Sequence, residues 1–235
     1  MSLNVSAVEL LAEPIPVAAV ISAALARPET NLTGHWRVHE LFRRSGLSQD
    51  LIDALVHANP VTRAGAARLC GAARLTEAVP WVGDLVRDPN PKVREAAIRA
   101  LAQLGGRRAV DILIAAEDTI PLYRLAIALS KAASDIDIEA LMRQPKSEKA
   151  ATVTVLACGL RHDVLRVPPL LGIAHDRRWP RQVRIASCTS LGMIGDAAAV
   201  DGLAHLAAGD PDPAVKKAAA RAERRLKRIA AGVQP

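Results

Sequence analysis

The chain has 235 residues, a formal net charge of +7 and only 2% aromatic residues, so any core must consist mainly of Ala, Leu, Val and Ile. No apolar run approaches the roughly 20 residues that a membrane-spanning helix needs. Residues 17–26, the longest candidate, lie between Pro16 and Pro28 without a basic leader, so we expect neither a membrane span nor a signal peptide.

The first part of the chain predicts helices that match the later pattern poorly. Prolines at positions 14, 16 and 28 bound two short helical segments, and a third helix is expected at residues 35–44. Terminal repeats commonly differ from internal ones because one of their faces meets water. We therefore predict an N-terminal helical cap, an atypical first repeat, over residues 1–47.

A proline-containing turn organises the rest of the chain. Residues 88–94 read DPNPKVR, and residues 210–216 repeat them as DPDPAVK. Prolines at positions 60, 91, 121 and 213 each precede a basic residue by three, and proline suits the first turn of a helix. A fixed spacing near 30 residues indicates stacked helical units, none of which buries its apolar face alone.

Between these proline-turn helices lie partner helices, expected at residues 78–87, 109–117, 136–143, 169–175 and 199–208. We predict an all-α fold, an α-solenoid (superhelix) of about six antiparallel helix pairs over residues 48–231, with a short tail at residues 232–235. One unit departs from the pattern. Glu148 occupies its expected basic position, and an insertion is expected around residues 160–169.

The two turn copies, with Leu104-Gly105 and Ala109-Val110 after the first, resemble the HEAT-like repeat family, especially its short bacterial type, found also in phycobilin lyases. The resemblance covers roughly residues 48–228. In this family the turn Asp and the Arg six residues later commonly form a ladder between adjacent repeats. The resemblance implies such positions at Asp88, Asp118 and Asp210, and an interruption where His57 and Arg178 replace the acid.

The positive charge is concentrated near the C-terminus. Residues 216–228 contain seven basic residues and one acidic residue, which gives +6 of the total +7. A helix of this kind is typical either of phosphate or anionic-surface binding or of a solvated terminal cap. The candidate anion-binding residues are Lys217, Arg221, Arg224, Arg225 and Arg228.

The proline-turn helices are expected to line the concave face of the solenoid, where the spacing predicts a row of exposed side chains. The predicted row consists of Arg68, Arg99, Leu125, Leu129, Val153, Thr189 and Arg221. A groove that is apolar in its middle and basic at its ends favours a peptide, a helix or an acidic protein segment over a small molecule. Trp179, in an arginine-rich turn, is either a further binding residue or a packing residue.

Catalytic and metal sites have little support in the sequence. Cys70, Cys158 and Cys188 lack CxxC spacing and align with core positions, so we expect them to pack in the core. His35 and the dipeptide His39-Glu40 alone have metal-like spacing. The HEAT-like hydroxylases that hold a di-iron centre use several His-Glu dipeptides in different repeats, whereas this chain contains only His39-Glu40.

HEAT-like DNA glycosylases require an aromatic pocket for a flipped base, whereas Trp81 and Tyr123 align with core positions here. The sequence therefore predicts a noncatalytic, cytoplasmic, bacterial scaffold or adaptor that binds a protein partner, without cofactor, metal or small-molecule substrate. Two alternatives stay open. One is nucleic-acid or anionic-surface binding by the basic C-terminal helix, and the other is an accessory enzyme such as a lyase-like chromophore attachment factor.

Overall fold

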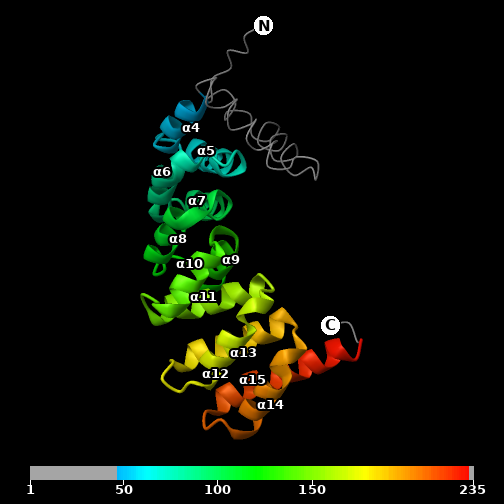
Figure 1. Cartoon of the computed structure of the whole chain (residues 1–235). Helices are drawn as coiled ribbons and strands as arrows, with labels where there is room; N and C mark the ends of the chain where they lie inside the picture. Colours follow the sequence, from blue (N-terminus) through cyan, green and yellow to red (C-terminus); the bar gives the residue numbers. More distant parts are fainter. Residues whose placement is uncertain (1–46, 233–235) are drawn as a thin grey trace. The chain divides into compact units, whose positions relative to one another are not determined.

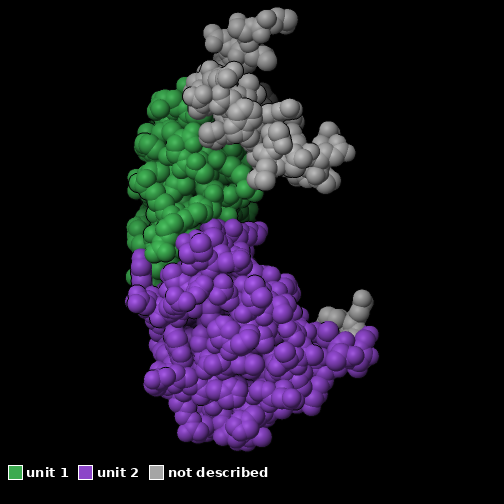
Figure 2. All heavy atoms as spheres, in the orientation of Figure 1, with its two compact units in different colours: residues 1–119 green, residues 120–235 purple. Residues whose placement is uncertain are grey.

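The computed structural model describes residues 47–232, and these residues form twelve α-helices and four short 3-10 helices without a strand. The helices follow one another in six pairs along the sequence, so the predicted all-α class and number of pairs are confirmed. The chain divides into two compact units, residues 1–119 and residues 120–235 (Figures 1 and 2). The predicted cap at residues 1–47 lies almost wholly outside the described residues and stays a prediction.

Unit 1 is built on the contact between two proline-turn helices. Its helices are α4 (Leu47–Leu55), α5 (Pro60–Ala72), α6 (Val79–Asp84), α7 (Pro91–Leu104) and α8 (Gly106–Ala115). Helix α5 packs against α7, α4 packs against α5, and α6 contacts both α7 and α8 (Figure 1).

Unit 2 repeats this arrangement. Its helices are α9 (Leu122–Ala132), α10 (Asp135–Arg143), α11 (Glu148–Leu160), α12 (Val167–His175), α13 (Arg181–Ile194), α14 (Val200–Gly209) and α15 (Pro213–Ala230). Helices α9, α11, α13 and α15 contact one another in succession, while α10, α12 and α14 pack against α11, α13 and α15.

Local chemistry explains where the proline-turn helices begin. The side chains of Asn59, Asn90 and Asp212 each accept a hydrogen bond from the backbone amide two residues later, at 2.8–2.9 Å. Proline occupies the first helical position that follows each of them, where no backbone donor is required. These caps place each helix start at the same point of its repeat.

Glycines allow neighbouring proline-turn helices to approach closely. A Cβ atom on Gly71 of α5 would lie 2.8 Å from the Cα atom of Ala100 in α7. A Cβ atom on Gly192 of α13 would lie 3.1 Å from the Cβ atom of Ala222 in α15. Small residues therefore set the spacing between helices.

The three cysteines are buried and belong to the core, as predicted. Burial raises the pKa of the Cys70 and Cys188 thiols to about 12 and that of Cys158 to about 11. A thiol with so high a pKa carries almost no thiolate at neutral pH and is a poor nucleophile.

Candidate functional site

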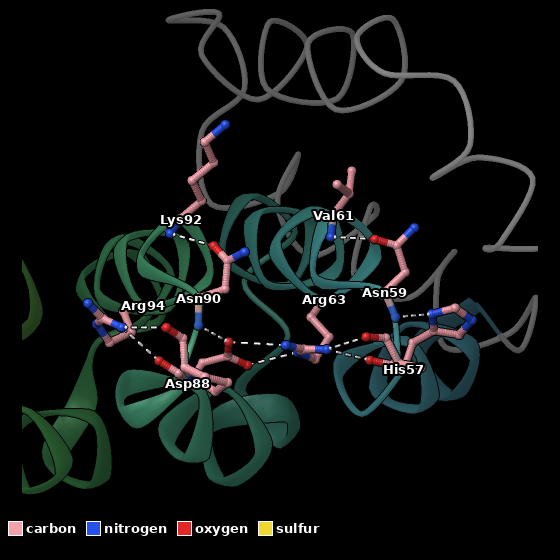
Figure 3. Close-up of polar contacts among 10 residues, drawn as sticks. His57, Asn59, Val61, Arg63, Asp88, Asn90, Lys92 and Arg94 are labelled. Carbon is pink, nitrogen blue, oxygen red and sulfur yellow. Dashed lines mark hydrogen bonds and ion pairs between the residues drawn. The ribbon is translucent and has the colours of Figure 1, made fainter.

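An arginine and an aspartate join two adjacent turns of unit 1 (Figure 3). Arg63 Nε and Nη2 donate to Asp88 Oδ2 and Oδ1 at 2.8 and 3.1 Å, and Arg63 Nη1 donates to the carbonyl oxygens of His57 and Ala58 at 2.8 Å. Asp88 Oδ1 also accepts the Asn90 amide at 2.8 Å. One guanidinium thus satisfies carbonyl groups of its own turn and the carboxylate of the next.

Arg94 makes only half of this arrangement. Its Nη1 donates to the carbonyl oxygens of Asp88 and Pro89 at 2.9 and 3.0 Å, as Arg63 does in the preceding repeat. Asp118 is exposed and forms no ion pair with Arg94 in the described part of the chain. The ladder contact that the resemblance implied between Arg94 and Asp118, which we call a rung, is therefore missing.

Unit 2 contains the second complete rung. Arg184 Nη2 pairs with Asp210 Oδ2, and Arg184 Nε donates to the carbonyl oxygen of Ala174 at 2.9 Å. Burial raises the pKa of Asp88 and Asp210, but hydrogen bonds from Arg63 and Arg184 and from backbone amides outweigh it. Both pKa values therefore lie below the ordinary 3.8.

The turn between α12 and α13 contains an acid that the sequence pattern missed. Asp176 follows the last residue of α12 and accepts hydrogen bonds from the backbone amide and the guanidinium of Arg178 at 2.9–3.1 Å. Asp176 precedes Arg184 by eight residues, because this turn is two residues longer than the Asp88 turn. Arg178 pairs with Asp176 inside its own turn, so the prediction that Arg178 replaces the turn acid is wrong. Trp179 is half-buried there.

The predicted exposed row is correct at some positions and wrong at others. Arg68 and Arg99 in unit 1, and Thr189 and Arg221 in unit 2, are exposed as predicted. Leu125, Leu129 and Val153 are fully buried, so their predicted exposure is wrong.

The error at α9 is one of register. In α7, two buried residues lie on each side of exposed Arg99, and in α9 two buried residues lie on each side of Ile127, which is 42% exposed. Anchoring the alignment on Pro121 placed α9 two residues away from this register. Ile127 is therefore the row residue of α9, and Leu125 and Leu129 face the core.

The error at α11 is a shift of three residues. Glu148 is the first residue of α11 and follows Ser147, whose side chain caps the helix as Asn90 caps α7. The fourth position of α11, which is basic in α5, α7, α13 and α15, is consequently Ala151 rather than Glu148. In this register Val153 faces the core. The insertion predicted at residues 160–169 is wrong, because the two additional residues of this unit lie in the longer turn before α13.

The candidate anion-binding residues lie together on α15. Lys217, Arg221, Arg224, Arg225 and Arg228 are all exposed, and we call these five residues the cationic face. The opposite side of the helix buries Val215, Ala219, Ala222 and Leu226.

Two aromatic residues and one histidine pair are also exposed. Trp81 is 40% and Tyr123 is 53% exposed, so the predicted core positions for both are wrong. The rings of His175 and His205, on adjacent helices α12 and α14, stack with centroids 5.9 Å apart.

Within residues 47–232, no three His, Cys, Asp or Glu side chains are grouped so that they could hold a metal ion. His35, His39 and Glu40 lie outside the described residues. None of the described helices combines the length and hydropathy that a membrane crossing requires.

Paired helices linked by buried arginine–aspartate contacts define an α-helical repeat protein. The HEAT repeat family matches residues 48–131 and 138–224, and the chain belongs to this family. No curated protein matches the chain.

Solved structures similar to the chain include human deoxyhypusine hydroxylase in complex with glycerol, at 21% identity and a TM-score of 0.39, covering 94% of this chain and 88% of that one. Another is the complex of CpcE and CpcF of phycocyanin lyase from Nostoc, at 19% identity and a TM-score of 0.39, covering 94% and 96%. Both identity and TM-score are too low to assign an activity to this chain.

Proposed function

We propose that the protein is a noncatalytic scaffold that binds a protein partner on the exposed face of its proline-turn helices. The observation that carries the proposal is the recurrent exposed residue of these helices. In unit 2, Ile127, Thr189 and Arg221 each stand exposed at the repeated position of α9, α13 and α15. Because α9, α11, α13 and α15 contact one another in succession, these side chains belong to one helical face.

The chemistry of this face suits a polypeptide. Ile127 supplies an apolar side chain that is 42% exposed, Thr189 supplies a methyl and a hydroxyl group, and Arg221 supplies a guanidinium. Leu156, the corresponding residue of α11, is 6% exposed and forms the floor between them. An apolar centre with a polar edge is the usual anatomy of a protein–protein interface.

Unit 1 offers its own basic surface. Arg68 of α5 and Arg99 of α7 occupy the repeated position there, and Arg99 Nε pairs with Glu95 Oε1 at 2.9 Å. We propose both arginines as a binding surface of unit 1. Trp179, which is half-buried in its arginine-rich turn, stays a candidate binding residue. The accessory-enzyme alternative stays a prediction that no contact of the described residues favours.

The test is reconstitution with a purified partner. Partners that co-purify from the native host are identified by mass spectrometry, produced separately, and titrated against the full chain by calorimetry. Ile127→Asp should weaken the binary complex at least about tenfold, because a carboxylate would be desolvated in an apolar contact. Ile136→Asp is the matched control, since Ile136 of α10 is 79% exposed and lies outside the proposed surface.

Two results would contradict the proposal. In the first, Ile127→Asp weakens no reconstituted complex more than Ile136→Asp does. In the second, no purified candidate forms a stable complex with the full chain at physiological salt.

A further inference from the structure

We propose that the cationic face of α15 binds an acidic polypeptide segment. This inference rests on the proposed function, because the segment would be the charged part of the same partner. It assigns a chemistry to that partner, a run of Glu or Asp side chains, which the family membership does not supply.

The first observation is that the charges of this face are uncompensated. Several arginines elsewhere in the described residues pair with carboxylates, as Arg63 does with Asp88, Arg143 with Glu139 and Arg184 with Asp210. The five residues of the cationic face form no ion pair or hydrogen bond within the described chain. Glu223, the acidic residue of α15, pairs instead with Lys227 at 2.6 Å.

The second observation is the linear arrangement of these charges. Lys217, Arg221, Arg224 and Arg228 recur at helical spacing on one side of α15, opposite the buried apolar residues, and Arg225 flanks them. Arg228 lies eleven positions after Lys217, which corresponds to about 16 Å along the helix axis. The cations therefore form a single file about three helical turns long.

The neighbouring helices restrict what this file can hold. Arg181 of α13 pairs with Asp212 at 2.9 Å, and the exposed polar residues of α14 include Asp201 and His205 rather than further cations. A nucleic-acid duplex presents two strands of phosphates and binds broader basic surfaces, while single strands use aromatic stacking platforms. Helix α15 contains no aromatic residue. A single acidic polypeptide fits one file of cations better than either.

Arginine is also well suited to carboxylates. Four of the five residues are arginines, whose guanidinium groups form paired hydrogen bonds with a carboxylate. Ile229, 40% exposed at the end of the same helix, offers an apolar contact to a neighbouring side chain of the segment.

The cations repel one another in the unbound protein. Lys217 and Arg221, Arg221 and Arg225, and Arg224 and Arg228 are each four residues apart, a spacing at which like charges destabilise a helix. Carboxylates bound between them would convert this repulsion into attraction. Binding of the acidic segment should therefore also stabilise α15.

The test uses the full chain and a fluorescein-labelled Glu-rich peptide about eleven residues long, which can span the file whether it is helical or extended. Anisotropy is measured at low and at physiological salt, with the Gln version of the peptide, oligothymidylate and phosphatidylserine vesicles as comparison probes. Arg221→Gln/Arg224→Gln should weaken peptide binding about tenfold, since each exposed ion pair contributes a factor of roughly three. The matched control is Lys131→Gln/Arg143→Gln, which removes two exposed charges elsewhere in unit 2.

The inference is supported if the Glu peptide binds, its Gln version does not, and only the α15 variant loses affinity. It is overturned if both double variants lose affinity equally, if the Glu peptide does not bind at low salt, or if oligothymidylate or vesicles bind more tightly than the peptide.

The reconstituted partner separates this inference from the proposed function. A complex that Ile127→Asp weakens and Arg221→Gln/Arg224→Gln does not would overturn the inference and leave the proposed function standing. A complex with the opposite response would overturn the binding face proposed around Ile127 and keep the acidic segment on α15.

Discussion

Helices α7 and α15 begin with nearly the same turn and then differ in what their surfaces do. Each follows an aspartate, Asp88 or Asp210, that pairs with an arginine of the preceding proline-turn helix. Helix α7 buries eight of its 14 residues, whereas α15 buries four of its 18 and carries five exposed, unpaired cations. The same turn therefore starts both helices, while their outer faces differ.

The cause of this difference lies in backbone hydrogen bonding. The turn aspartate accepts a hydrogen bond from the backbone amide two residues later, and the arginine donates to backbone carbonyl oxygens, exposed at His57 and buried at Ala174. These requirements are the same in the Asp88 and Asp210 turns, so the residues that meet them are the same in both. The exposed face has no such requirement, so its residues can differ from one helix to the next.

The largest expected effect tests whether the two turns are equivalent. Asp210→Ala should destabilise the protein by about 3–5 kcal/mol, because it leaves the Arg184 guanidinium buried without its counter-ion. Asp88→Ala should cost less, about 1–3 kcal/mol, because Arg63 retains some water contact. The side chains of Arg184 and Arg63 are 6% and 14% exposed. Urea unfolding followed by circular dichroism measures both.

The double variant Arg184→Met/Asp210→Ala is the control for a stranded charge. It should recover part of the stability lost in Asp210→Ala, since the buried guanidinium is gone. Equal losses of stability in Asp88→Ala and Asp210→Ala, with no recovery in the double variant, would contradict this prediction. The deeper burial of the Arg184–Asp210 pair would then not increase its contribution to stability.

The second prediction compares how tightly each helix packs on its neighbour. Gly71→Ala should destabilise by about 1–3 kcal/mol, because the new Cβ atom would meet the backbone of α7 at Ala100 and one helix must move. A Cβ atom on Gly192 would lie 3.1 Å from the Cβ atom and 3.3 Å from the Cα atom of Ala222, which is less crowded than at Gly71. The higher helix propensity of alanine, worth about 1 kcal/mol, should offset this crowding. Thermal unfolding of the two variants gives the ranking, and a larger loss for Gly192→Ala would contradict it.

The turns could be predicted from sequence because their chemistry is local. The prolines, the capping residues Asn59 and Asn90, and the spacing from Asp88 to Arg94 all act within a few residues. They were sufficient to predict the helix pairs and the positions of Asp88 and Asp210.

The register inside the helices depends on contacts that no local motif encodes. Proline is compatible with either the N-cap or the first helical position, so Pro121 did not fix the register of α9, and Leu125 was assigned to the wrong face. The N-cap of α11 is Ser147, whereas Asn or Asp caps α5, α7 and α15. The sequence pattern therefore did not identify Glu148 as the first residue of the helix. The missing signal was the pattern of two core residues on each side of one outward residue, as at Ile127.

Lowering the pH perturbs both turns more mildly than the alanine substitutions do, because it protonates Asp88 and Asp210 without removing them. The folded-state pKa values of Asp88 and Asp210 lie below the ordinary 3.8, so both carboxylates contribute stability above that pH. This contribution should be lost as the pH falls through 3.8 toward the folded-state values. The loss should be smaller than in the alanine variants, because a protonated carboxyl still accepts a hydrogen bond. In Asp88→Asn, the free energy of unfolding, measured with urea, should fall less steeply as the pH drops below 3.8. An unchanged pH dependence would contradict the lowered pKa of Asp88.

The smallest expected effect is a change in the free energy of unfolding that has opposite signs in α7 and α15. Arg99 and Arg221 occupy the same repeat position, but Arg99 pairs with Glu95 four residues earlier, whereas Lys217 stands four residues before Arg221. Arg99→Gln should therefore lower the free energy of unfolding by about 0.3–0.5 kcal/mol. Arg221→Gln should raise it by about 0.5–1 kcal/mol, because it relieves repulsion from Lys217, Arg224 and Arg225.

Salt is the control that identifies the cause of these two shifts. Surface charge interactions are screened as ionic strength rises, so both differences from the parent protein should shrink together in salt. A stabilisation by Arg221→Gln that persists at high salt would point to helix propensity or packing instead of charge. If Arg221→Gln destabilised the protein at low salt, the cationic face would not be under repulsion, and a polyanionic partner would have no strain to relieve.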